Sequence, residues 1–128
     1  MGVRFCEVVI MVKDFQRGKE FYEKLFETKI NEKMHEDRWA SPIPQISLIN
    51  PEFDAKKNVP SGYNNVRYGN NVILTLLTDD LEKEKERIID IGGESITKTC
   101  RINYRVPYHY FHFEDTEGNT IEIGHYPK

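Results

Sequence analysis

The feature that most constrains the fold of this chain is an arrangement of elements that occurs twice along it. A segment rich in β-branched residues leads to Asp14, which can cap a helix, and apolar residues at helical spacing follow. The same arrangement begins again at Asp80, and the offset that carries Asp14 to Asp80 also carries Tyr22 to Ile88 on the expected buried face. About three strand-like segments follow each helix. The repeat predicts an α+β fold of two βαβββ modules that form curved mixed sheets around a cleft.

We expect the two modules, at about residues 1–60 and 66–128, to form one domain. Strands are predicted at residues 4–12, 45–49, 72–77, 96–103 and 106–113. A polar strand pair or edge is expected within 28–40, and the prolines of 41–44 should interrupt the pattern because proline has no amide proton to donate. The stretch 50–71 is the longest irregular one, and we expect it to be a linker or a mobile loop.

A strand, a tight turn and a second strand end the chain. Gly118 can take the left-handed conformation that such a turn demands. The alternation of side chains along a strand places Tyr108, Tyr110 and His112 on one face and phenylalanines on the other. The second strand adds Glu122 to the polar face and isoleucines to the apolar one. We therefore expect a hairpin that covers a core on one side and lines a polar site on the other.

Composition excludes several classes of function. With 128 residues, 38% hydrophobic and 30% charged, the chain is large enough for a core and has the balance of a soluble globular protein. A net charge of −3 gives no basic surface for nucleic acid, and no apolar run approaches a membrane span or a signal peptide, so we expect a cytoplasmic protein. Cys6 and Cys100 have no metal-site spacing and should be reduced thiols, with Cys6 in a core neighbourhood.

Three motifs carry a resemblance to a known family: VVIMVKDFQRGKEFYEKLFETKI, LTLLTDDLEKEKERIIDIGGESI and FHFEDTEGNTIEI. The chain resembles the vicinal oxygen chelate superfamily, which includes glyoxalase I, bleomycin-resistance proteins, fosfomycin-resistance enzymes and extradiol dioxygenases. The last motif is similar to the family's acidic, glycine-containing turn before a strand that ends in glutamate, with Thr116 in place of the usual proline. The resemblance covers most of the chain except roughly 31–71.

The resemblance also implies where a metal would be held. The four positions fall on Glu7, Ser47, Ile73 and Glu122, and family members commonly have histidine at the first. Isoleucine has no donor atom and serine is a poor ligand for transition metals, so the usual site should be lost and no cofactor is expected. A divalent metal stays possible if His112 joins the two glutamates as a third ligand.

On the fold that the resemblance implies, Glu7 and Glu122 lie on neighbouring strands and face the cleft. Two close carboxylates raise the pKa of one of them, and the pair is our candidate for general acid–base catalysis or for binding a cation. Glu7 could instead be solvated or bonded to a core hydroxyl. The expected ligand-binding residues are His112, Tyr110, Tyr108, Trp39, Ser47 and Arg105, with Arg101 as a second candidate at the mouth.

Two functions from different classes follow. The first is a small-molecule binding protein of the bleomycin-resistance type, with an unknown ligand, because tyrosine faces favour aromatic or cationic ligands. The alternative is a divergent metal-dependent lyase, isomerase or transferase related to glyoxalase I. The resemblance further implies a homodimer, since family members commonly complete their clefts by pairing.

Overall fold

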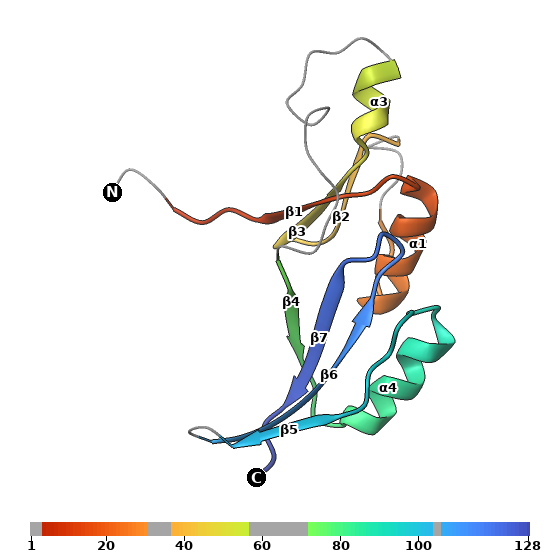
Figure 1. Cartoon of the computed structure of the whole chain (residues 1–128). Helices are drawn as coiled ribbons and strands as arrows, with labels where there is room; N and C mark the ends of the chain where they lie inside the picture. The colour runs from red at the N-terminus through yellow and green to blue at the C-terminus, as the bar shows by residue number, and fades with distance from the viewer. Residues whose placement is uncertain (1–3, 31–36, 57–71, 104–105) are drawn as a thin grey trace. The chain divides into compact units, whose positions relative to one another are not determined.

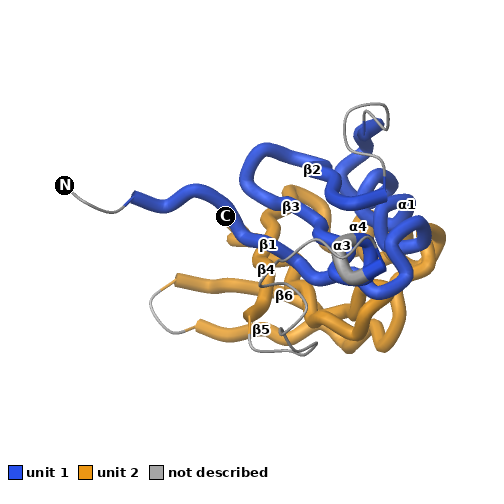
Figure 2. The backbone as a smooth tube through the Cα atoms, turned by 90° about the horizontal axis from the view of Figure 1, so that it is seen from above, with its two compact units in different colours: residues 1–68 blue, residues 69–128 orange. Residues whose placement is uncertain are grey.

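The computed structural model describes residues 4–30, 37–56, 72–103 and 106–128. They belong to two compact units, residues 1–68 and residues 69–128 (Figure 2), and each unit is described here by itself. Each unit has its own mixed sheet together with helix (Figure 1), so the predicted α+β class with two mixed sheets is confirmed. Within the described ranges, no helix is long and apolar enough to cross a membrane.

Unit 1 holds a sheet of three strands. Its elements are β1 (Val8–Met11), α1 (Phe15–Leu25), β2 (Trp39–Ile43), β3 (Ile46–Ile49) and α3 (Pro51–Lys56). The strand order is β1-β3-β2, with β1 parallel to β3 and β2 antiparallel to it. The central strand β3 is therefore paired with both other strands, and its side chains lie beside those of β1 and β2.

The helix α1 supplies much of the core of unit 1. It begins as predicted at Asp14, whose side chain accepts a hydrogen bond from the backbone N–H of Arg17. Its buried face includes Phe21 and Tyr22, the latter only 1% exposed, and α1 contacts β2 and β3. Leu48 on the central strand is fully buried. The helical spacing of aromatic residues therefore marked the buried side of this helix correctly.

Two predictions for unit 1 are wrong because proline was given too much weight. Residues 41–43 do not interrupt the pattern but lie inside β2, which is the edge strand of the sheet. An edge strand tolerates Pro42 because one row of its amide groups has no partner, and the register shifts between Ala40 and Ile43. Part of the stretch expected to be irregular forms α3, with Pro51 at its first position, where the missing amide proton costs nothing. Residues 57–71 lie outside the described residues.

The first strand is shorter than predicted. Only Val8–Met11 of the segment 4–12 forms β1. Cys6 precedes this strand and is exposed, so its expected core position is wrong. Residues 28–30 form no strand, and residues 31–36 of the expected polar edge lie outside the described residues.

Unit 2 holds a sheet of four strands. Its elements are β4 (Leu74–Leu77), α4 (Leu81–Asp90), β5 (Cys100–Asn103), β6 (Pro107–Glu114) and β7 (Thr120–His125). The order is β4-β7-β6-β5, with β4 parallel to β7 and the other pairs antiparallel. The strand predicted at 96–103 begins later, at Cys100.

The registers of the two sheets correspond to each other. Val9 pairs with Ser47 between β1 and β3, and Thr75 pairs with Glu122 between β4 and β7. The offset that carries Asp14 to Asp80 also carries Val9 to Thr75. Ser47 and Glu122 therefore occupy corresponding places in the two sheets.

The helix α4 covers one face of the unit 2 sheet. Asp80 caps it by accepting from the N–H of Lys83, as predicted. Ile88 on this helix and Phe111 and Phe113 on β6 are fully buried, and the ammonium group of Lys85 lies 5.1 Å from the centre of the Phe111 ring. The apolar face of the closing hairpin therefore forms a core with α4, which leaves its polar face for other contacts.

The hairpin turn is held by backbone and side-chain bonds. Gly118 has a φ of +80°, the left-handed conformation that was expected. Asp115 is 2% exposed and its carboxylate accepts from the backbone N–H groups of Glu117 and Asn119. These bonds fix the register in which β6 and β7 meet.

Candidate functional site

The polar face of the unit 2 sheet carries a cluster of five side chains. β6 contributes Tyr108, Tyr110 and His112, β7 contributes Glu122, and Tyr126 follows the end of β7. We call these five residues the Glu122 cluster. His112 lies directly opposite Glu122 in the antiparallel register, and paired residues share a face of a sheet. The alternation predicted from the sequence is therefore confirmed for the three residues of β6 and for Glu122.

Both oxygens of the Glu122 carboxylate are engaged by protein groups. The hydroxyl of Tyr108 donates to Oε2 at 2.7 Å, and Nε2 of His112 lies 2.9 Å from Oε1. An ionised carboxylate can only accept, so Nε2 of His112 carries a proton. The side chains of His112 and Glu122 are 31% and 19% exposed, so the carboxylate is partly buried and still within reach of a ligand.

The aromatic rings of the cluster form a continuous row. The ring of Tyr108 stacks on that of Tyr110 with centroids 5.6 Å apart, and Tyr110 lies 5.2 Å from the ring of His112. On its other side, Tyr108 lies 4.8 Å from Tyr126. Such a row presents flat π-surfaces beside a carboxylate, which suits an aromatic or cationic group.

Two tyrosine hydroxyls of the cluster are held in the protonated form. Burial of Tyr108, together with its hydrogen bond to Glu122, raises the pKa of its hydroxyl far above the ordinary range. The hydrogen bond between Tyr110 and Cys100 raises the pKa of Tyr110 in the same direction. Tyr108 is therefore a hydrogen-bond donor to Glu122 at neutral pH.

Unit 1 holds a second group of polar side chains, from β2, from β3 and from Glu7, the residue before β1. The hydroxyl of Ser47, 4% exposed, donates to Oε2 of Glu7 at 2.6 Å and lies 2.9 Å from the hydroxyl of Ser41. Because the single proton of Ser47 goes to Glu7, the hydroxyl of Ser41 must donate to Ser47. Glu7 is therefore bonded to a core hydroxyl.

Several predicted site residues are not brought together by these contacts. Glu7 belongs to unit 1 and Glu122 to unit 2, so their expected proximity stays a prediction. Trp39 is half-buried on β2, where it pairs with Ile49. Arg105 lies outside the described residues, and the role of Arg101, exposed on β5, stays a prediction.

Sequence reasoning missed Tyr126 on this face, and it gave no role to Gly124, although the alternation along the strand places Gly124 on the same face as Glu122. Tyr126 extends the aromatic row, and Gly124 lies between it and Glu122 on the same side of β7. The signal was present, since residues 122, 124 and 126 follow the period of two. The alternation was followed only as far as Gly124, and a glycine offers no side chain that would suggest a role.

The donor atoms at the four positions implied by the family are few. Ile73 has none, the hydroxyl of Ser47 is bonded to Glu7, and both oxygens of Glu122 already accept hydrogen bonds. Among the residues that the structure describes, no three or more histidine, cysteine or acidic side chains are grouped so that they could hold a metal ion. This set of donors does not fit the usual metal of the family.

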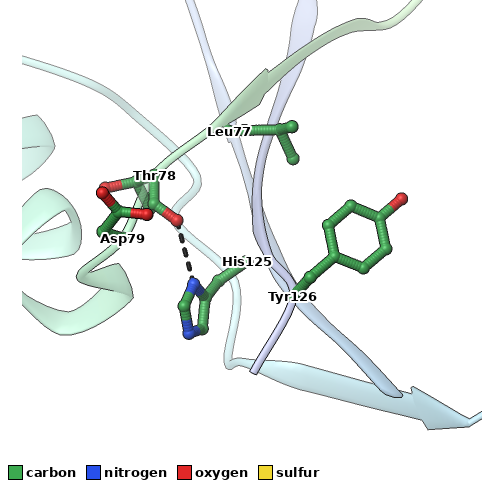
Figure 3. A pocket seen from close by; sticks show the side chains of 5 residues that line it. All are labelled: Leu77, Thr78, Asp79, His125 and Tyr126. Carbon is green, nitrogen blue, oxygen red and sulfur yellow. Dashed lines mark hydrogen bonds between the residues drawn. The ribbon is translucent and has the colours of Figure 1, made fainter. Parts of the chain in front are cut away.

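A cavity of about 210 Å³ lies at the end of the same sheet. Its lining residues are Leu77, Thr78, Asp79, His125 and Tyr126 (Figure 3). Nδ1 of His125 donates to the backbone carbonyl of Thr78 at 2.9 Å. In Figure 3 the side chains of His125 and Tyr126 lie on opposite sides of β7, as neighbours along a strand must. The hydroxyl of Tyr126 therefore does not converge with His125 on one point.

Comparison with known proteins identifies the family. Residues 4–123 match the family model for the Glyoxalase/Bleomycin resistance protein/Dioxygenase superfamily, and the chain belongs to this superfamily. A search of curated proteins found no significant match. The resemblance stated from the three motifs is thus confirmed at the level of the family.

Solved structures show the same fold. A glyoxalase/bleomycin resistance protein/dioxygenase family enzyme from Burkholderia phytofirmans PsJN is similar with a TM-score of 0.72 and 15% identity, covering 98% of this chain and 100% of that one. A protein from the mobile metagenome of V. Pseudocholerae has a TM-score of 0.70 and 25% identity, covering 100% and 98%. A lactoylglutathione lyase from Agrobacterium tumefaciens has a TM-score of 0.65 and 16% identity, covering 98% of this chain and 95% of that one. At 16% identity the last likeness is one of fold and carries no reaction to this chain.

Proposed function

We propose that this chain is a small-molecule binding protein whose site is the Glu122 cluster, and that it takes a flat ligand with a positive charge. The observation that carries the proposal is the partly buried carboxylate of Glu122, fixed by Tyr108 and His112 beside a row of aromatic rings. A carboxylate held at a fixed place next to π-surfaces is complementary to a planar cation.

The charge of the cluster supports a cation rather than an anion. No lysine or arginine in the described ranges pairs with Glu122, and the described group that faces its Oε1 is the ring of His112. The hydroxyl of Tyr108 donates its hydrogen bond to Glu122 and therefore cannot donate it to an anionic ligand. An anionic ligand would therefore meet repulsion from the carboxylate, and no lysine or arginine of the described residues is paired with Glu122 to offset it.

We further infer that binding does not depend on the metal usual in the family. Serine and isoleucine stand at two of the four implied positions, and the carboxylates of Glu7 and Glu122 are both bonded to protein donors. Isoleucine has no donor atom and serine is a poor ligand for transition metals, so the two glutamates alone do not make up the usual site. The general acid–base role of Glu7 and Glu122 stays a prediction.

A set of three nearly isosteric probes tests the proposal. We expect benzamidinium to bind more tightly than neutral benzamide, and benzoate to bind most weakly, in calorimetric titrations. The Glu122→Gln variant should weaken benzamidinium by about tenfold, or about 1.4 kcal/mol, and leave benzamide nearly unchanged. Glu82→Gln, on the exposed side of α4 in the same unit, is the matched control and should change nothing. Equal binding of benzoate and benzamidinium would contradict the proposal.

From the resemblance we also propose a cytoplasmic homodimer. Large apolar side chains such as Leu77 and Ile102, 66% and 48% exposed, are consistent with a surface that a second copy covers. Sedimentation equilibrium should then give about twice the 15.1 kDa mass of the chain. A single species at the monomer mass would contradict the dimer and leave the proposed site in unit 2 untouched.

A further inference from the structure

The position of Tyr108 depends on Gly124, a residue that has no side chain. In the antiparallel register Gly124 lies opposite Tyr110, two residues beyond Glu122 on β7. Tyr108 must therefore lean along the sheet and pass over Gly124 to bring its hydroxyl to Glu122. The space above Gly124 is the path that the ring uses.

The distances show how completely the ring fills this space. A Cβ atom placed on Gly124 would lie 1.9 Å from the hydroxyl oxygen of Tyr108, 2.3 Å from its Cζ and 2.4 Å from its Cε1. All three are far below van der Waals contact. No residue with a side chain fits at position 124 while Tyr108 keeps its place.

The backbone of Gly124 does not itself require glycine. The glycines with positive φ in the described residues are Gly92 and Gly118, and Gly124 is not among them. Its carbonyl accepts an ordinary strand bond from Thr78 at 2.9 Å. An alanine can therefore adopt this conformation, and the three atoms nearest to its Cβ would all belong to Tyr108, whose ring lies at the end of a rotatable side chain.

We propose that Gly124 is a positioning residue of the site: its missing side chain forms the slot in which Tyr108 lies across β7 and holds Oε2 of Glu122. The slot keeps the carboxylate of Glu122 in the orientation that a ligand meets, and this consequence for binding rests on the proposed function. The geometric part of the inference holds whether or not a ligand is found. With the slot filled, Tyr108 swings away and Glu122 keeps only His112.

The Gly124→Ala variant tests the inference through the ionisation of Tyr108. With tyrosine labelled in its ring and the Tyr108 signal assigned from Tyr108→Phe, NMR follows the hydroxyl as pH rises. Release of the hydroxyl from its partly buried place, together with loss of its bond to Glu122, should move the pKa of Tyr108 back toward its ordinary value of 10.0. Benzamidinium affinity should fall severalfold in the same variant. An unchanged titration of Tyr108 would overturn the inference.

A second variant keeps the test decisive if Gly124→Ala folds poorly. In the Tyr108→Ala background the clash is gone, so Gly124→Ala should then cost little stability. If Gly124→Ala costs as much stability in the Tyr108→Ala background as it does in the wild-type protein, the slot is not the reason for glycine and the inference is wrong. If the wild-type protein binds no probe but the Tyr108 titration shifts as expected, the proposed ligand fails and the positioning role stands.

Discussion

At the scale of single residues, the bond between Tyr108 and Glu122 links the chemistry of the site to the stability of the fold. The hydroxyl is kept protonated by burial and by the carboxylate beside it. Glu122 in turn gains two fixed donors, so its side chain is held in one orientation before any ligand arrives. Such preorganisation reduces the ordering that binding would otherwise require.

Replacing Tyr108 by phenylalanine should therefore change both stability and its pH dependence. Losing a hydrogen bond to a charged group costs about 1.5 kcal/mol at neutral pH. Above pH 10.0 the unfolded chain ionises at this position while the folded chain stays protonated, so the wild-type protein loses stability as pH rises further. Tyr108→Phe removes this contribution, so its free energy of unfolding should fall less steeply with pH than that of the wild-type protein. Denaturant unfolding at a series of alkaline pH values measures this slope.

Tyr126→Phe is the control for that comparison, since no hydrogen bond from this exposed tyrosine to Glu122 is present. The Tyr126→Phe variant should lose stability with rising alkaline pH as steeply as the wild-type protein does. Identical slopes for the Tyr108→Phe variant and the wild-type protein would contradict a raised pKa at Tyr108.

The residues of the cluster were predictable in part. The period of two along β6 was enough to place Tyr108, Tyr110 and His112 on one side, since the strand is unbroken. The slot at Gly124 was not predictable, because it depends on how far the Tyr108 ring leans along the sheet. A sequence gives the face of a side chain more readily than its rotamer.

At the scale of elements, the two long helices are set by their caps. Asp80→Ala should destabilise the protein by about 1 kcal/mol, because the N–H of Lys83 loses its acceptor. Its neighbour Asp79 does not cap α4, so Asp79→Ala should cost much less in the same thermal or denaturant unfolding experiment. Equal effects of the two variants would show that general charge at the helix start, rather than the cap, is responsible.

Local signals explain which elements the sequence predicted well. Both long helices have a capping aspartate and a stripe of apolar residues, and α4 also stops at a glycine pair. These signals are local, because the residues that carry them lie close together in the sequence. The strand through Pro42 was missed because its tolerance of proline follows from being at the edge of the sheet, which is a property of the assembled unit. The helix at Pro51–Lys56 was missed because six residues give too little periodicity to recognise.

At the scale of the whole molecule, the family gives the fold, and the resemblance implies that two of its four usual metal positions hold Ser47 and Ile73. We expect Zn²⁺, Ni²⁺, Mn²⁺ and Co²⁺ to leave the thermal midpoint of the metal-stripped protein unchanged. An ion at a hundredfold excess over its dissociation constant would add about 2.7 kcal/mol, or roughly 10 °C for a chain of this size. A shift of that order, absent from the Glu7→Gln, Glu122→Gln double variant, would revive the metal-dependent reading.

The measurement that tests the central proposal most directly is NMR of the histidine ring protons during titration with benzamidinium. His112 belongs to the Glu122 cluster, whereas His109 on the same strand and His125 on the next point to the other face of the sheet. Binding at the cluster predicts a saturable shift of the His112 signals with little change at His109 and His125, and the loss of that shift in Glu122→Gln. Shifts at His109 or His125 without one at His112, or none at any of the three, would contradict the proposed site.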